Sequence, residues 1–181
     1  MGIRLLILGA NGQLGHSLSQ HAKPALGETL NELVCWGKDK VDFTKPDQIV
    51  SALKDVRPDV VINAAAYTQV EKAEDEPDIA HQINAKSVGV LAEQAKKQDV
   101  VLVHYSTDYV FDGTLGRPYV ETDPLAPVNA YGQSKAEGEN YLLQIGGNWV
   151  CFRTGWVYAQ RGHNFAKPCL KPPVPATNCI L

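Results

Sequence analysis

The hydrophobic positions of the chain form short apolar runs separated by segments with helical spacing. The runs lie at residues 3–8, 33–36, 60–62, 100–103 and 149–152. A short apolar run bounded by turn residues is typical of a strand buried on both faces. Apolar residues at three- and four-residue spacing predict helices near residues 14–24, 46–56, 77–98 and 129–143. We expect Pro24 to end the first helix and Thr44 to cap the second.

Alternating strands and helices predict an α/β fold with a doubly wound parallel sheet of the Rossmann type. The pattern stops after Lys167. Four of the fourteen residues in 168–181 are proline, which predicts irregular or disordered chain. We therefore expect one NAD(P)-binding domain over 1–167 and an irregular tail over 168–181.

Composition narrows the classes of function. The 181 residues are 44% hydrophobic and 20% charged, with a formal net charge of -3, so no basic surface recruits nucleic acid. No apolar run reaches membrane-spanning length, and the chain enters a strand pattern at once. We therefore predict a cytoplasmic protein with no membrane partner. Its cysteines, which form no CxxC pair, are expected to be reduced thiols: Cys35, Cys151, Cys169 and Cys179.

A glycine-rich turn follows the first predicted strand. Gly9, Gly12 and Gly15 form a GxxGxxG pattern that includes Gln13 and Leu14. Glycines permit a tight turn and close approach of a pyrophosphate, and the following helix offers free N–H groups. Such a turn alone is weak evidence, but its place between strand and helix predicts a dinucleotide site.

The end of the second strand leaves the choice between NADH and NADPH open. No acidic residue stands at the strand tip to hold a ribose hydroxyl. Lys38 is either a partner for a 2'-phosphate or a solvated loop lysine. Asp42 and Phe43 could hold adenine, or be a helix-entry aspartate and a core ring.

Two further strand ends carry candidate groups. Residues 63–68 read Asn-Ala-Ala-Ala-Tyr-Thr, and their small side chains either let a cofactor lie along the backbone or simply pack in the core. After the fourth strand, the Thr107 hydroxyl could bond a substrate carbonyl, although serine and threonine are also common in turns.

Tyr131 and Lys135 lie four residues apart on one face of the fourth predicted helix. A nearby ammonium favours a phenolate, so we predict that Lys135 lowers the pKa of Tyr131. Tyr131 would then give a proton to a carbonyl oxygen, and Lys135 would also hold the nicotinamide ribose. A tyrosine packed on a lysine stem is the alternative for this pair taken alone.

The chain resembles the extended short-chain dehydrogenase/reductase family. The resemblance rests on "GANGQLG", "DFTKP", "RPDVVINAAAYTQVEKAEDEP", "HYSTDYVFDG", "YGQSKAEGE" and "FRTGWVYAQRGHNFAK". It implies NADPH- or NADH-dependent reduction of the 4-keto group of dTDP-4-dehydro-L-rhamnose to dTDP-L-rhamnose, with a dTDP-sugar as substrate. It leaves a homodimer and a Mg²⁺ requirement open.

The resemblance also implies roles for single residues. The cofactor contacts would be Gly12, Gln13, Leu14, Asp42, Phe43, Ala66, Tyr67 and Thr68. Thr107, Tyr131 and Lys135 would be catalytic, with Thr107, Asp108 and Trp156 contacting substrate. Asn84 matches a structural asparagine of the superfamily, or is an ordinary surface amide.

The sequence departs from the family pattern at three places, one of which is the missing acidic residue at the end of the second strand. Gly155 stands where the family usually has serine. Family members are also longer, and their C-terminal part grips the nucleotide, so we expect weak turnover, an unpaired sheet edge and exposed core. A non-catalytic NAD(P)-binding subunit and another nucleotide-sugar reductase or epimerase remain alternatives.

Overall fold

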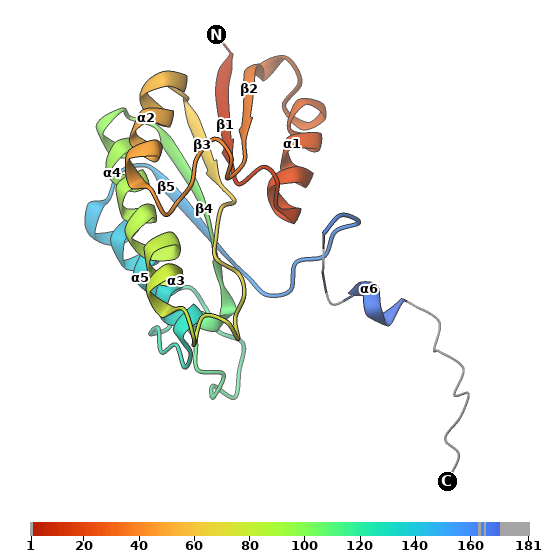
Figure 1. The fold of residues 1–181 in the computed structure, drawn as a ribbon, viewed down its shortest axis with the longest axis vertical. Helices are drawn as coiled ribbons and strands as arrows, with labels where there is room; N and C mark the ends of the chain where they lie inside the picture. The colour runs from red at the N-terminus through yellow and green to blue at the C-terminus, as the bar shows by residue number, and fades with distance from the viewer. Residues whose placement is uncertain (1, 163, 165, 171–181) are drawn as a thin grey trace.

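The computed structural model describes residues 2–162, 164 and 166–170 and has one five-stranded sheet with helices on both faces (Figure 1). The strands are all parallel and lie in the order β2-β1-β3-β4-β5. In the first half the elements are β1 (Ile3–Leu8), α1 (Gln13–Leu26), the 3-10 turn η1 (Gly27–Thr29), β2 (Leu30–Trp36), α2 (Pro46–Val56) and β3 (Val60–Asn63). The predicted doubly wound sheet is confirmed.

The second half completes the sheet. Its elements are α3 (Pro77–His81), the π-helical turn η2 (Gln82–Lys86), α4 (Ser87–Lys97), β4 (Val101–Thr107), the 3-10 turn η3 (Asp108–Val110), α5 (Ala130–Ile145), β5 (Trp149–Thr154) and α6 (Ala166–Cys169). The long helix predicted over 77–98 is present, with η2 as its middle turn. The ends of β4 and β5 lie side by side, because Thr107 pairs with Thr154.

Most of the core lies between the sheet and the helices α2, α4 and α5. Alternate residues of β1 point to opposite faces, so Leu6 and Leu8 enter this main core. Leu5 and Ile7 enter a smaller core under α1 together with Ala22. Figure 1 shows α1 alone on its face, beside β1 and β2. Burial of each such side chain contributes about 1.5 to 3 kcal/mol to stability.

Several predicted boundaries are wrong for local reasons. Helix α1 continues past Pro24 to Leu26 and ends at Gly27, whose φ of 53° suits glycine. Thr44 does not cap α2, because its hydroxyl and N–H both donate to the Asp42 carboxylate. Pro168 and Cys169, predicted to be irregular, lie in α6, while 171–181 lie outside the described residues.

The face of β4 and β5 opposite α5 carries exposed apolar side chains. Val150 and Phe152 are 46% and 49% exposed, and Val101 is also exposed. The Phe152 ring packs on Tyr105 at a centroid distance of 5.7 Å. Among the described strands β5 is an edge strand, as the sequence predicts. Exposed apolar groups beside free strand edges are typical of surfaces that bind further polypeptide.

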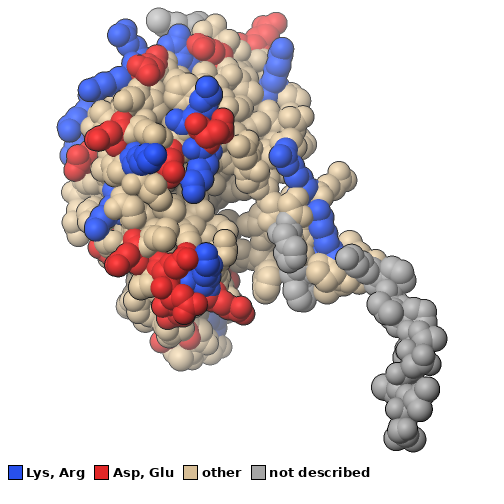
Figure 2. Space-filling view, viewed as in Figure 1, with Lys and Arg blue, Asp and Glu red and all other residues tan. Residues whose placement is uncertain are grey.

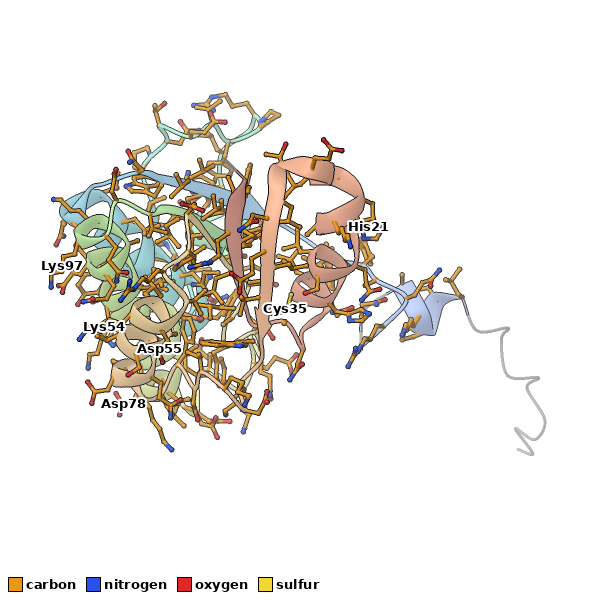
Figure 3. All side chains as sticks on the ribbon, turned by 90° about the horizontal axis from the view of Figure 1, so that it is seen from above. His21, Cys35, Lys54, Asp55, Asp78 and Lys97 are labelled. Carbon is orange, nitrogen blue, oxygen red and sulfur yellow. The ribbon has the colours of Figure 1, made fainter. Side chains whose placement is uncertain are left out.

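Charged side chains lie on the outer faces of the helices. Figure 3 shows Lys54 and Asp55 of α2 and Lys97 of α4 pointing away from the sheet. Figure 2 shows Asp and Glu gathered at the end of the molecule below α3, where the segment 71–78 is rich in acidic residues. No helix of the described residues has both the length and the apolar character needed to cross a membrane.

The described cysteines are free thiols. Cys35 is exposed on β2, Cys151 is half-buried on β5 and Cys169 is exposed. Burial raises the pKa of the Cys151 thiol to about 11, and the charge of Glu139 adds to this shift. Cys151 is therefore protonated at neutral pH and is a poor nucleophile.

Candidate nucleotide and reductase site

The glycine turn joins the end of β1 to the start of α1. Gly9 has φ +77°, and a Cβ there would lie 2.5 Å from the Ala65 backbone nitrogen. A Cβ at Gly15 would lie 2.2 Å from the Gly9 carbonyl oxygen. Both glycines are therefore required by close backbone packing, which lets the turn lie against the end of β3.

The opposite side of this turn is suited to a pyrophosphate. Gly12 is the N-cap of α1 and has no side chain to bond the first amides, and the first turn holds no acidic residue. A Cβ at Gly12 would meet only the Gly9 oxygen at 3.4 Å, so the backbone is open to solvent. Gln13 and Leu14, also predicted to bind cofactor, form the first turn of the helix. The residues present therefore fit the diphosphate of NAD(P)H.

The loop after β2 contains an acidic residue, Asp39, to which the sequence analysis gave no role. The Asn11 amide donates to Asp39 Oδ1 at 3.3 Å, which places this carboxylate beside the glycine turn. Asp39 lies beyond the last strand residue, Trp36, so an acidic residue expected at the strand tip itself does not include it. A Cβ at Gly37 would lie 2.1 Å from the Asn11 amide nitrogen, so Gly37 permits this contact.

Asp42 and Phe43 lie between β2 and α2. Bonds from Thr44 hold the pKa of the Asp42 carboxyl below its ordinary value. The Phe43 ring is buried in the main core, so it presents little surface to an adenine. The packing of this ring favours the core alternative for Phe43, and the role of Asp42 stays a prediction.

The segment after β3 is held by Asn84, which the sequence left undecided. Asn84 lies in η2 and is only 1% exposed. Its Oδ1 accepts from the Tyr67 N–H at 2.9 Å, and its Nδ2 donates to the Tyr67 carbonyl at 3.0 Å and to Ser134 at 3.0 Å. Asn84 is therefore a structural residue that fixes the backbone of the predicted cofactor segment, including Ala66 and Thr68, against α5.

The carboxyl end of β4 carries two predicted substrate contacts. Thr107 is buried, donates its hydroxyl proton to Asp108 Oδ1 at 3.0 Å and accepts from the Tyr109 N–H at 3.2 Å. Asp108 is exposed, with its Oδ2 facing Gly155, where an added Cβ would lie 3.1 Å away. The glycine therefore leaves space beside this carboxylate that a serine would fill.

Tyr131 lies in the first turn of α5 next to this strand end. Asn129 caps the helix by accepting from the Gly132 N–H at 2.7 Å. The Tyr131 ring contacts Tyr109 edge-on at 5.7 Å. Burial raises the pKa of Tyr131 above its ordinary value, which outweighs the lowering by its hydrogen bond with Thr107. The structure thus places Tyr131 beside the strand end that carries Thr107, and their joint role stays a prediction.

Lys135 lies one turn further along α5 and is 2% exposed. Its ammonium donates to the Tyr105 carbonyl at 2.6 Å. Burial lowers the pKa of Lys135 to about 8, although the nearby Cys151 and Glu139 raise it. The predicted lowering of the Tyr131 pKa is therefore wrong: burial disfavours the phenolate, and the ammonium is directed at the β4 backbone.

A buried histidine on β4 was also missed by sequence reasoning. The Asn63 amide donates to His104 Nδ1 at 3.1 Å, and Asn63 Oδ1 accepts from the Ala65 N–H at 3.1 Å. His104 Nε2 has no hydrogen-bond partner among the described residues. Burial, and then the charge of Lys135, place the pKa of His104 well below its ordinary value. His104 is therefore neutral.

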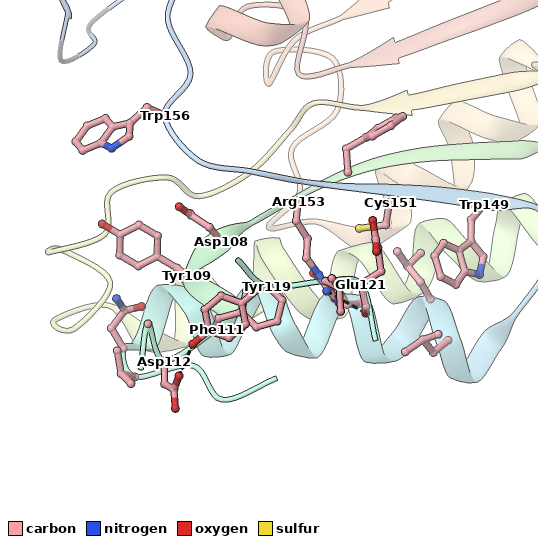
Figure 4. A pocket seen from close by; sticks show the side chains of 18 residues that line it. Asp108, Tyr109, Phe111, Asp112, Tyr119, Glu121, Trp149, Cys151, Arg153 and Trp156 are labelled. Carbon is pink, nitrogen blue, oxygen red and sulfur yellow. Dashed lines mark hydrogen bonds and ion pairs between the residues drawn. The ribbon is translucent and has the colours of Figure 1, made fainter. Parts of the chain in front are cut away.

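Trp156 lies at the mouth of a cavity of about 1070 Å³ that Asp108 and Tyr109 also line. Figure 4 shows the indole across this mouth from Tyr109. Trp156 is 68% exposed, so much of its indole surface is accessible, and its contact with substrate stays a prediction. The cavity continues along α5 to Trp149, with Arg153 in its wall.

The segment after β5 returns to the glycine turn, a contact that the sequence does not predict. Asn164 is buried, and its amide donates to Gln13 Oε1 at 2.9 Å and to the Ala159 carbonyl at 2.7 Å. Arg161 contacts His16 Nδ1 at 3.1 Å. Residues 145 or more positions apart thus share one end of the sheet, the end where the predicted cofactor and substrate groups lie.

The parallel sheet, the glycine turn and the polar groups at the ends of β3 and β4 define a nucleotide-binding α/β protein, in which ligands bind beyond the carboxyl ends of the strands. Residues 3–172 match the family described as the RmlD substrate binding domain. The chain belongs to this family.

The curated relatives include dTDP-4-dehydrorhamnose reductases. The chain is 46% identical to that of Burkholderia thailandensis, over 93% of this chain and 55% of the relative. It is 40% identical to that of Escherichia coli K12, with 93% and 56% covered. The crystal structure of the Bacillus anthracis reductase in complex with NADP is 37% identical with a TM-score of 0.87, covering 93% of this chain and 58% of that one. The chain thus spans about half the length of these relatives.

Proposed function

We propose that the chain forms the cofactor half and the catalytic groups of a cytoplasmic, NADPH- or NADH-dependent reductase of dTDP-4-dehydro-L-rhamnose. The observation that carries this proposal is the placement of the Tyr131 ring at the carboxyl end of β4, where it contacts the ring of Tyr109, two residues after Thr107. The glycine turn occupies the corresponding end of β1 in the same sheet. A dTDP-sugar as substrate is supported by the names of the relatives, and a homodimer stays a prediction.

The cofactor, when bound, supplies hydride to the keto carbon. The glycine turn and the first amides of α1 bind its diphosphate, and the backbone of residues 66–68, fixed by Asn84, lies alongside it. The Tyr131 phenol donates to the carbonyl oxygen of the sugar, and the Thr107 hydroxyl, turned away from Asp108 Oδ1, donates a second bond to it. Because the pKa of Tyr131 is raised, the phenol is protonated at neutral pH and can donate its proton to that oxygen.

Lys135 helps to hold the strand end that carries Thr107. Its ammonium bonds the Tyr105 carbonyl, two residues before Thr107, and so fixes the end of β4 against α5. An ammonium has three N–H donors, which permits a further bond to the cofactor ribose. This second contact stays a prediction.

A Tyr131→Phe variant tests the proton-donor role. We expect NADPH binding, measured by fluorescence titration, to change less than about twofold, while turnover falls by about 10² to 10⁴ as for loss of a general acid. Tyr141→Phe is a matched control, because Tyr141 lies on the same helix but packs on Gly89. Unchanged turnover in Tyr131→Phe would remove the proposed role and favour a different proton donor.

The turnover assay, run beside this titration, separates the reductase from the non-catalytic alternative. A regulatory subunit that only binds NAD(P) would bind NADPH and show no oxidation of NADPH with the keto sugar. Titrations with NADPH and NADH in parallel also decide the cofactor preference, for which Lys38 and Asp39 are the nearest charged candidates at the end of β2.

A further inference from the structure

Arg153 joins three segments that lie far apart in the sequence. It stands on β5 opposite Ser106 of β4. Figure 4 shows its side chain pointing from β5 toward α5, with Phe111 and Tyr119 beside it. The sequence offers no signal for this role, because a single arginine on an edge strand is usually solvent-exposed.

The guanidinium binds Glu139 with fork geometry. Arg153 Nε lies 3.0 Å and 3.2 Å from the two carboxylate oxygens, and Nη2 lies 2.7 Å from Oε2. Glu139 is buried on α5, two turns after Tyr131. A planar fork that meets a carboxylate in this way fixes the orientation of both groups, which a lysine cannot do.

The other contacts of Arg153 are with the segment after β4. The guanidinium carbon lies 5.1 Å from the centre of the Phe111 ring, and Nη1 donates to the Glu121 carbonyl at 3.3 Å. Phe111 stacks on Tyr119 at 4.2 Å. Removing the guanidinium therefore releases both the start and the middle of the loop 111–128 from α5.

This loop adjoins the predicted substrate contacts. Phe111 follows the turn η3, whose first residues are Asp108 and Tyr109. The Tyr109 carbonyl packs so closely on α5 that a Cβ at Gly132 would lie 2.3 Å from it, and the Tyr109 ring contacts Tyr131. A shift of Phe111 is thus transmitted over two or three residues to the groups that face the sugar.

We propose that Arg153 is a positioning residue for the reductase: by joining Glu139 of α5 to Phe111 and Glu121, it holds Asp108 and Tyr109 in register with Tyr131. The inference rests on the proposed function for its effect on the reaction. Its structural part, the fixing of residues 108–123 by the pair of Arg153 and Glu139, can be tested without substrate.

The test uses the full chain and three variants. Arg153→Gln and Glu139→Gln each remove the ion pair, and Arg153→Lys keeps the charge without the fork. Arg4→Gln is the control, because Arg4 pairs with Glu32 at 2.6 Å at the opposite end of the sheet. Amide hydrogen exchange by mass spectrometry compares residues 108–123 with β1 and β3. In parallel, NADPH affinity and the KM and kcat for the keto sugar are measured.

We expect faster amide exchange in residues 108–123 for Arg153→Gln and Glu139→Gln, with exchange in β1 and β3 unchanged. Arg153→Lys should recover part of the protection of residues 108–123. Arg4→Gln should leave exchange in residues 108–123 unchanged. In the enzyme assay, Arg153→Gln should raise KM for the keto sugar about tenfold, because a misplaced binding group costs affinity, with NADPH affinity altered less than twofold.

Unchanged exchange in residues 108–123, or an increase spread equally over β1 and β3, would overturn the inference, since either result assigns Arg153 no local role. Should the two glutamine variants fail to fold, Arg153→Lys alone decides, because the loss of the fork must then appear as local exchange. Absence of turnover in the wild-type chain would count against the proposed function, whereas the exchange result decides the role of Arg153.

Discussion

Burial of the Lys135 ammonium lowers the free energy of unfolding, and replacing the lysine with an uncharged residue should raise it again. The pKa of Lys135 is lowered from 10.5 to about 8, mainly by burial. One pKa unit corresponds to about 1.4 kcal/mol, so the charged form destabilises the folded state by about 3 kcal/mol at neutral pH. Lys135→Met has similar length and no charge. It loses the bond to the Tyr105 carbonyl, which is worth about 1 kcal/mol.

We therefore expect Lys135→Met to be more stable than the wild type by about 2 kcal/mol near pH 7. The difference should depend on pH. Between about pH 8 and 10.5 the unfolded wild type retains the Lys135 proton that the folded state has released, so wild-type stability rises with pH in this window. The advantage of the variant should therefore shrink as the pH is raised.

Urea unfolding at several pH values, followed by tryptophan fluorescence, measures both quantities. Cys151 opposes the effect above its ordinary pKa of 9, because its folded pKa is raised to about 11 and folded-state stability then falls with pH. Measurements between pH 7 and 9 keep this contribution small, because Cys151 is mostly protonated below pH 9 in both the folded and the unfolded state. If Lys135→Met is less stable at pH 7 and the difference stays constant up to pH 9, Lys135 is not a buried charge that destabilises the fold.

Three further predictions follow from packing and hydrogen bonding. Gly9→Ala, at φ +77° with a Cβ 2.5 Å from the Ala65 nitrogen, should cost about 2 to 3 kcal/mol in urea unfolding and abolish NADPH binding by fluorescence; normal affinity would contradict the assignment of the turn. Leu53→Ala, fully buried in the main core, should cost about 2 to 5 kcal/mol without altering NADPH affinity of the folded protein. Asn84→Ala should cost about 2 to 4 kcal/mol and speed amide exchange at Tyr67, since two backbone groups lose their partner; an unchanged exchange rate would show that the contact is dispensable.

The main elements could be predicted because burial on both faces of the sheet leaves continuous apolar runs. The run at 3–8 coincides with β1, and the run at 149–152 covers β5 except for its last two residues. The end of β4 was placed too early, since residues 104–107 are polar or aromatic. Their polarity reflects contacts with Asn63 and Lys135 that come from other strands and helices, and no local pattern encodes these.

Residues of the candidate site were predictable where a short spacing carries geometry. The pair of Tyr131 and Lys135 and the glycine turn are of this kind. The direction of the Tyr131 pKa was not predictable, because it depends on burial and on which acceptor takes the Lys135 ammonium. The contacts of Arg153 and Asn164 join residues that are far apart in the sequence. No local sequence pattern therefore predicts them.

The π-helical turn at Gln82–Lys86 holds one residue more than an α-helical turn would, and Asn84 lies in it. Deleting one residue here would let the turn close as an ordinary α-helical turn, so α3 and α4 could keep the faces that pack on α5. The Asn84 amide would then leave the Tyr67 backbone, whose N–H and carbonyl it bonds. The extra residue is therefore needed to place Asn84, and the two helices could be joined without it.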